Sequence, residues 1–221
     1  MKVIALMAPK ARSGKTTFAT ALVENMKAEG LMVAQIAFAN DLKTQCVNRL
    51  SDSRDVRNML RDIDQTDAKD APLRSLSIDK VHDVEYRKFL MNRYVGHDAP
   101  RSWRWHCTQF GTAFMRVHKE DQLVWIRKVF DKILALNAQG YDYVIIDDLR
   151  TEAEASALKM LNACFIEINR GQVDITQPVE STYSGLAQCV GSDVWQLYFN
   201  DVKHNQSAAK AWAVKFKVDN E

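Results

Sequence analysis

Short apolar runs of strand length alternate along this chain with segments that have helical periodicity. The expected strands are residues 2–7, 31–38, 143–146, 164–168 and 194–199. The expected helices cover about 14–29, 121–137 and 152–161, with a last helix near Ser207. Because a strand, a helix and a second strand in succession usually form a parallel pair, the sequence predicts an α/β fold with a five-stranded parallel sheet between two layers of helices.

The loop after the first apolar run carries the most specific motif of the chain. A phosphate-binding P-loop has the pattern GxxxxGK[ST] after a strand and before a helix. Gly14, Lys15 and Thr16 match this pattern in register, whereas Pro9 stands at the position of the first glycine. Backbone N–H groups at the start of the helix still provide an anion site. The expected ATP-binding residues are Lys10, Ala11, Arg12, Ser13, Gly14, Lys15, Thr16 and Thr17.

A magnesium site is expected beside this loop. Lys15 would bridge the β- and γ-phosphates of ATP, and the Thr16 hydroxyl would ligate Mg²⁺. Asp147 and Asp148 follow the apolar run 143–146, at the end of a strand where ligands of α/β folds bind. They are the other expected metal ligands. Turn formation or helix capping is the alternative role for the two aspartates.

The alternation of strands and helices is interrupted after residue 50. Ten of the twenty residues 51–70 are charged and show no strand pattern. We interpret about 44–108 as a helical insert within one P-loop domain that spans 1–221. A solvated cap and a substrate-covering lid both fit this insert. Residues of about 171–192, which have weak periodicity, are expected to form a short lid-like loop.

Composition narrows the expected partners and the expected compartment. The formal charge of +2 is too small for a general nucleic-acid binder, and no apolar run approaches the roughly 20 residues of a membrane helix. The four cysteines are widely spaced, which indicates neither a disulfide framework nor a zinc site. We therefore expect a cytoplasmic protein that binds small-molecule nucleotides, with no nucleic acid and no membrane as partners. A homodimer is left open.

Three segments resemble the deoxynucleoside monophosphate kinases of bacteriophages, a branch of the adenylate-kinase-like P-loop kinases. Residues 37–43, AFANDLK, resemble the F-A-x-x-L-K signature of that family. Residues 109–116, QFGTAFMR, with Arg104 before them and Trp125 after them, are similar to a second block of the family. Asp148, Arg150 and Glu154 resemble the D-x-R-F-x-x-E stretch.

The resemblance implies transfer of the ATP γ-phosphate to a deoxynucleoside monophosphate, with Mg²⁺ as cofactor and dNDP and ADP as products. It also implies an inserted helical subdomain for the monophosphate, and the host cytoplasm if the protein is phage-encoded. For Trp125, core packing and pocket lining are both open. The residues that match the monophosphate site are Lys43, Arg104, Gly111, Thr112, Arg116, Trp125, Asp148, Arg150 and Glu154.

Four cations are the expected catalytic residues: Lys15, Arg12, Arg150 and Arg170. Residues 171–192 contain no Arg or Lys, so an arginine-rich lid like that of adenylate kinases is not expected. Our hypothesis is that Arg12 takes the place of lid arginines. Near-normal turnover of an Arg12→Ala variant at saturating substrate concentrations would contradict this role.

Two other functions share the phosphate-binding motif. A partitioning-type switch ATPase is one, because Lys10 lies five residues before Lys15, although Ala11 and Arg12 replace glycines of that class. A P-loop kinase of another small metabolite is the other. The expected cations on the acceptor side, which include Lys43 and Arg104, favour a phosphorylated acceptor over a neutral one.

Overall fold

The computed structural model describes residues 1–9, 13–64, 66–170, 183–191, 194–199 and 202–218. The chain forms two compact units. The first consists of Met1–Phe38 together with Lys128–Glu221, and the second of Ala39–Arg127. The insert that the sequence predicts at about 44–108 lies within the second unit.

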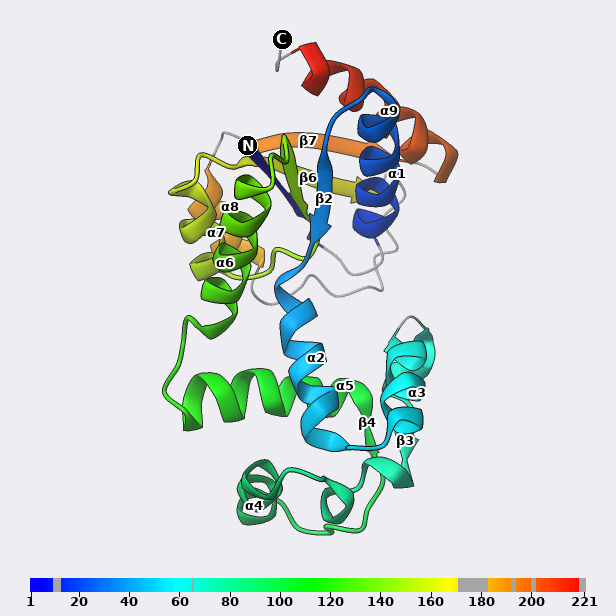
Figure 1. The fold of residues 1–221 in the computed structure, drawn as a ribbon, viewed down its shortest axis with the longest axis vertical. Helices are drawn as coiled ribbons and strands as arrows, with labels where there is room; N and C mark the ends of the chain where they lie inside the picture. Colours follow the sequence, from blue (N-terminus) through cyan, green and yellow to red (C-terminus); the bar gives the residue numbers. More distant parts are fainter. Residues whose placement is uncertain (10–12, 65, 171–182, 192–193, 200–201, 219–221) are drawn as a thin grey trace. The chain divides into compact units, whose positions relative to one another are not determined.

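The first unit is built on a five-stranded sheet in which all neighbouring strands are parallel (Figure 1). The strand order is β2-β5-β1-β6-β7. The strands are β1 (Lys2–Met7), β2 (Val33–Ile36), β5 (Tyr143–Ile146), β6 (Cys164–Arg170) and β7 (Val194–Phe199). The α/β fold with a five-stranded parallel sheet is thus confirmed.

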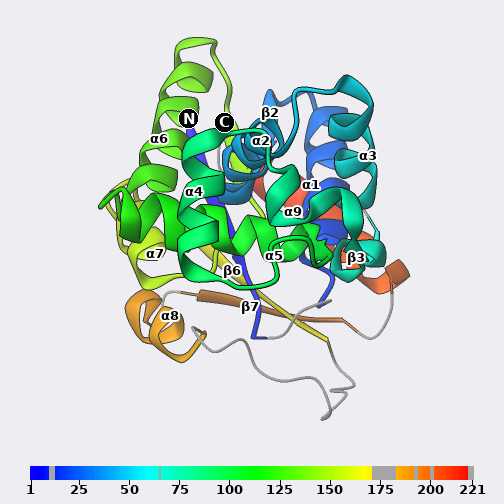
Figure 2. The same ribbon diagram turned by 90° about the horizontal axis from the view of Figure 1, so that it is seen from below.

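The central strand β1 is buried on both faces. Ala5 pairs with Ile146 of β5 on one side and with Phe165 of β6 on the other. Ala5, Leu6 and Met7 have no exposed surface, which explains why the strand is a continuous apolar run. The register places the carboxyl ends of β1 and β5 next to each other. On its other side, β1 is bordered by β6, and β7 forms that edge of the sheet beside β6 (Figure 2).

Helices cover both faces of this sheet, as right-handed connections between parallel strands require. The helices α1 (Lys15–Ala28) and α9 (Val202–Val218) pack together on one face (Figure 1). The other face carries α6 (Val124–Ala138), α7 (Glu152–Lys159) and α8 (Tyr183–Val190). On the α1–α9 face, helices and sheet share a core that includes Phe18 and Met26 of α1, Phe216 of α9 and Leu6 of β1. The Tyr143 hydroxyl also donates to the Phe216 carbonyl oxygen at 2.7 Å.

The second unit is mainly helical. Its longer helices are α2 (Phe38–Leu50), which starts at the end of the first unit, α3 (Arg54–Asp64), α4 (Val84–Arg93), α5 (Trp103–Thr108) and a π-helix, η4 (Gln109–His118). Its shorter elements are β3 (Pro72–Leu73), β4 (Arg101–Ser102) and the 3-10 turns η1 (Asp67–Asp70), η2 (Arg74–Leu76) and η3 (Ile78–Lys80).

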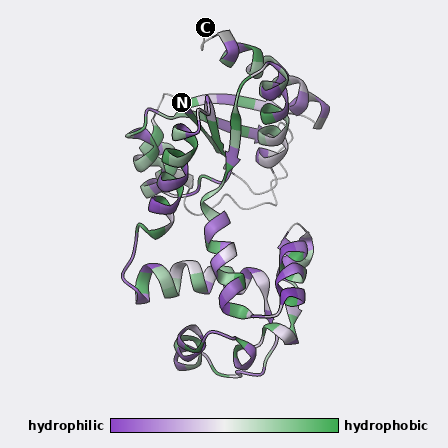
Figure 3. Cartoon of the chain, viewed as in Figure 1, coloured by the Kyte–Doolittle hydropathy of each residue, from purple (hydrophilic) through white to green (hydrophobic). Residues whose placement is uncertain are grey.

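Aromatic side chains form the core of the second unit. Tyr86 contacts Phe110 and Phe114 at ring-centroid distances of 5.4 and 5.2 Å. The surface of α3 is mainly hydrophilic (Figure 3). Its buried Leu60 nevertheless packs into this core, so the charged segment is an amphipathic helix of the unit.

Two boundaries differ from those expected. The second strand ends at Ile36, and Phe38 already begins α2, because the Asp148 carboxylate accepts a hydrogen bond from the N–H of Phe38. The helix expected from about residue 121 begins at Val124. No helix among the described residues is long and apolar enough to cross a lipid bilayer.

Candidate functional site

The start of α1 follows the central strand at its carboxyl end. Ser13 is buried with 7% of its surface exposed, and Gly14 has φ of 90° and ψ of 14°. This left-handed conformation is inexpensive only for glycine, which explains the glycine before the helix. Three of the expected ATP-binding residues, Lys10, Ala11 and Arg12, lie outside the described residues.

The first turn of α1 has the properties of an anion site. The N–H of Phe18 is bonded to the carbonyl oxygen of Gly14 at 2.9 Å, and N–H groups earlier in the turn have no carbonyl partner within the helix. Gly14 provides no side-chain cap, and the first turn contains no acidic residue. Thr16 and Thr17 are exposed. The positive end of the helix dipole therefore faces an accessible surface.

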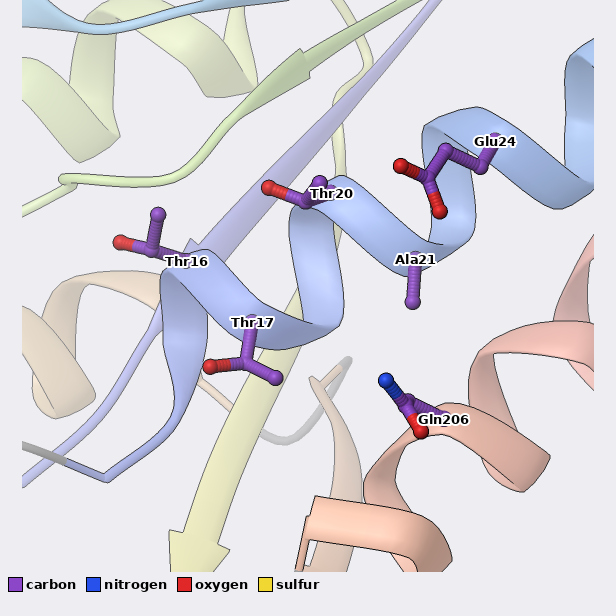
Figure 4. Close-up of a pocket in the computed structure, with 6 residues that line it drawn as sticks. All are labelled: Thr16, Thr17, Thr20, Ala21, Glu24 and Gln206. Carbon is purple, nitrogen blue, oxygen red and sulfur yellow. The ribbon is translucent and has the colours of Figure 1, made fainter.

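A cavity of about 370 Å³ begins at this turn and continues along α1 (Figure 4). Figure 4 shows Gln206 of α9 pointing toward Ala21 of α1. The lining of this cavity contains hydroxyl and amide groups, which both donate and accept hydrogen bonds, and a carboxylate, which accepts them. The sequence analysis missed Glu24 and Gln206 because no motif marks them. The lining residues are Thr16, Thr17, Thr20, Ala21, Glu24 and Gln206.

Asp147 and Asp148 lie at the carboxyl end of β5, beside the end of β1. One carboxylate oxygen of Asp147 accepts from the Gln35 amide at 2.8 Å, and one of Asp148 accepts from the Phe38 N–H at 2.8 Å. Both side chains are half-buried. Carboxylates and the Thr16 hydroxyl are hard oxygen donors of the kind that Mg²⁺ takes, so these residues fit that ion. The capping role that the sequence left open is also seen for Asp148.

Glu154 forms part of the start of α7. It is buried with 4% exposure, and one carboxylate oxygen accepts from the N–H groups of Arg150 and Thr151 at 3.0 and 3.1 Å. Thr151 completes a capping box by accepting from the Glu154 N–H. The T-x-x-E spacing is a known signal for this motif, and our sequence analysis missed it. A role of Glu154 in monophosphate binding stays a prediction.

Two further arginines, Arg150 and Arg170, were expected to be catalytic. Arg150 is exposed just before α7. Arg170 is the last residue of β6, where its backbone pairs with Phe199, and its side chain lies outside what the structure describes. Catalytic roles for both stay predictions.

Two expected phosphate-binding cations of the second unit are paired with aspartates. Lys43 Nζ lies 2.9 Å from Asp64, and Arg104 Nε lies 2.5 Å from Asp70. Asp64 also accepts from the Trp103 indole at 2.9 Å. The sequence did not predict these partners. Both aspartates belong to the short stretch that ends α3 and forms η1, so one segment of the chain neutralises both cations.

The π-helix η4 carries the other candidates of this unit. A Cβ at Gly111 would lie 2.2 Å from a methyl group of Leu42, so Gly111 allows α2 to pack closely. Trp125 is 1% exposed, and its indole donates to the Gly111 carbonyl oxygen at 3.1 Å. This burial favours core packing, one of the two roles that the sequence left open. Thr112 is exposed and Arg116 is half-buried.

No family model matches this sequence, and a comparison with curated proteins finds no match either. Among solved structures, a sugar kinase from Janibacter sp. HTCC2649 aligns with 98% of this chain and 94% of its own chain, at 12% identity and a TM-score of 0.41. Cobyrinic acid a,c-diamide synthase from Mycobacterium smegmatis, with bound ADP and magnesium, aligns with 100% of this chain and 82% of its own, at 15% identity and a TM-score of 0.39. Both scores are too low to carry a conclusion about function.

Proposed function

We propose that this chain is an ATP-dependent phosphotransferase that binds the phosphates of ATP at the start of α1. One observation carries the proposal. Gly14, Lys15 and Thr16 open a helix at the carboxyl end of the central strand, Gly14 provides no side-chain cap, and Thr16 and Thr17 of the first turn are exposed. Backbone N–H groups, the helix dipole and a lysine side chain then act on the same phosphates.

The acceptor that we propose is a deoxynucleoside monophosphate. This part depends on the resemblance of residues 37–43 and 109–116 to the phage kinases. It is supported by two cations of the second unit, Lys43 and Arg104, because positively charged side chains suit an acceptor that carries a negatively charged phosphate. Arg104 and Asp70 are both more than half exposed, and such an ion pair exchanges at little cost in water. The Lys43 side chain is 39% exposed, and its partner Asp64 is 13% exposed.

The proposed chemistry is alignment and charge neutralisation. The acceptor phosphate is already ionised at neutral pH, so attack on the γ-phosphate needs no general base. Lys15 would bind the β- and γ-phosphates, while Arg12, Arg150 and Arg170 would neutralise charge that moves during transfer. Thr16, Asp147 and Asp148 would hold Mg²⁺, which screens the phosphate charges when it is bound.

The test is ATP consumption by the purified protein with each deoxynucleoside and ribonucleoside monophosphate in turn. We expect at least one deoxynucleoside monophosphate to stimulate consumption and to yield a diphosphate. Binding of MgATP without stimulation by any monophosphate would overturn the proposed acceptor and leave ATP binding in place. Absence of ATP binding would overturn the whole proposal.

A further inference from the structure

Asn205 of α9 lies against the residue that opens α1. Its side chain is 4% exposed, and its Nδ2 donates to the carbonyl oxygen of Gly14 at 3.2 Å. The two residues are 191 positions apart in the sequence. Helix α9 is thus hydrogen-bonded to the glycine that precedes α1 in the candidate phosphate site.

This hydrogen bond fixes the orientation of one peptide group. The Gly14 carbonyl also accepts from the Phe18 N–H at 2.9 Å, so two donors hold it along the helix. A trans peptide is planar, and its C=O and N–H groups point in opposite directions. A fixed Gly14 carbonyl therefore directs the N–H of Lys15 out of the helix end, toward the place where an anion would bind.

The contact between the two residues is close. A Cβ added to Gly14 would lie 2.9 Å from Nδ2 of Asn205, and Gly14 has a φ of +90°. The amide of Asn205 consequently packs directly on the Cα of Gly14. The glycine serves both the left-handed turn and this contact.

Packing alone does not explain an asparagine at this position. Its Oδ1 is buried and has no hydrogen-bond partner within the part of the chain that the structure describes. A buried acceptor without a donor lowers the stability of a fold, and an apolar side chain of the same shape does not carry that cost. An apolar side chain, however, could not donate the second hydrogen bond to the Gly14 carbonyl. The Asn205 amide supplies that hydrogen bond.

We propose that Asn205 is a positioning residue for nucleotide binding, which acts by holding the Gly14–Lys15 peptide in the orientation that binds phosphate. This inference rests on the proposed binding of ATP at the same site. It adds a residue outside the phosphate loop, on α9, to the determinants of ATP affinity.

The test compares Asn205→Leu with a matched variant, Asn25→Leu. Asn25 also donates its amide to a backbone carbonyl of α1, that of Ala21, at 2.7 Å, but at a distance from the start of the helix. For each protein the dissociation constant of MgATP is measured by calorimetry, and the midpoint of thermal unfolding is measured without nucleotide. We expect Asn205→Leu to weaken MgATP binding about tenfold while its unfolding midpoint is equal to or above that of the wild type. Asn25→Leu should leave the dissociation constant unchanged.

Three results would overturn the inference. Unchanged binding in Asn205→Leu, beside a wild type that binds MgATP, would remove the positioning role alone. Weaker binding together with a lower unfolding midpoint would identify Asn205 as a structural support only. A wild type that does not bind MgATP would overturn the proposed function and the positioning role together.

Discussion

A carboxylate oxygen of Asp148 accepts a hydrogen bond from the backbone N–H of Phe38 at 2.8 Å. The residue expected to hold Mg²⁺ thus also stabilises the first residue of α2. The substitution Asp148→Asn can separate the two roles. Asparagine keeps an oxygen that accepts from the Phe38 N–H, but its neutral amide is a weaker ligand for Mg²⁺ than a carboxylate.

For Asp148 we expect the alanine variant to lose about 1 kcal/mol of unfolding free energy and the asparagine variant to lose much less. Both variants should need more Mg²⁺ for half-maximal ATP consumption. Urea unfolding and a magnesium titration measure the two effects. Equal magnesium requirements in the wild type and Asp148→Asn would show that Asp148 serves only as a cap.

Substitution of Lys15 should strongly reduce turnover without unfolding the protein. Lys15→Ala removes the side chain expected on the β- and γ-phosphates, and loss of one well-placed charged donor reduces turnover about a hundredfold or more. The measurement is the rate of ATP consumption together with circular dichroism. Lys27→Ala, in the last turn of the same helix, is the control and should keep full activity.

Lys43→Met tests the acceptor side. If Lys43 leaves Asp64 to bind the acceptor phosphate, its loss should raise the KM for the monophosphate about tenfold and leave the KM for ATP unchanged. Stability should change little, because Asp64 keeps the hydrogen bond from the Trp103 indole and an ion pair with a 39% exposed lysine contributes about 1 kcal/mol. Lys80→Met removes another lysine paired with an aspartate, Asp79 at 3.8 Å, and serves as the control. An equal rise in both KM values would count against a specific acceptor role.

Gly111→Ala should destabilise the second unit. The new methyl group would meet Leu42 at 2.2 Å, and overpacking of this kind costs about 1–3 kcal/mol. Denaturant unfolding measures the loss. The double variant Gly111→Ala with Leu42→Ala should lose less stability than the sum of the losses in the two single variants, since each substitution makes room for the other. Strict additivity would show that the two positions do not clash.

The stability of the fold should decrease in mild acid because of His106. Burial is the main cause that lowers the pKa of His106 from 6.5 to about 4, with a further contribution from Arg101. Its ring is bonded to the Leu76 carbonyl oxygen at 2.7 Å. Between pH 6.5 and 4 the unfolded chain binds a proton at this residue that the folded chain does not. His106 therefore costs the fold no stability above about pH 6.5. By pH 4, proton binding to the unfolded chain lowers the free energy of unfolding by about 3 kcal/mol.

The His106→Gln variant provides the measurement. Its free energy of unfolding should be lower than that of the wild type at pH 7 but should fall less steeply between pH 6.5 and 4. The difference between the two curves isolates the histidine from the carboxylates that also titrate in acid. Parallel curves would show that His106 does not carry this pH dependence.

The sheet could be predicted from the sequence because its strands are buried on both faces. Residues 143–146 are fully apolar and form β5 without an exposed position. Phe38 was harder to assign, because a β-compatible residue was placed at the start of a helix by an aspartate 110 positions away. Such long-range hydrogen bonds leave no local pattern.

The candidate site was predictable only where a motif is local. Gly14 and Lys15 lie next to each other in the chain, and their spacing alone indicates the start of α1. The partners of Lys43 and Arg104 depend on how α3 and η1 return to these cations, and Asp64 resembles any other charged residue of a solvated helix. Asn205 lies outside every motif, since its environment is created by the packing of α9 on α1.

The pairing of β1 has a consequence for the order in which the molecule is made. Both strands that border β1 begin only at Tyr143 and Cys164, so β1 leaves the ribosome long before either of the strands that pair with it. The second unit, Ala39–Arg127, is one continuous segment and can assemble during that delay. A chain that ends before Tyr143 should therefore contain a protease-resistant helical unit while the five-stranded sheet is still unformed.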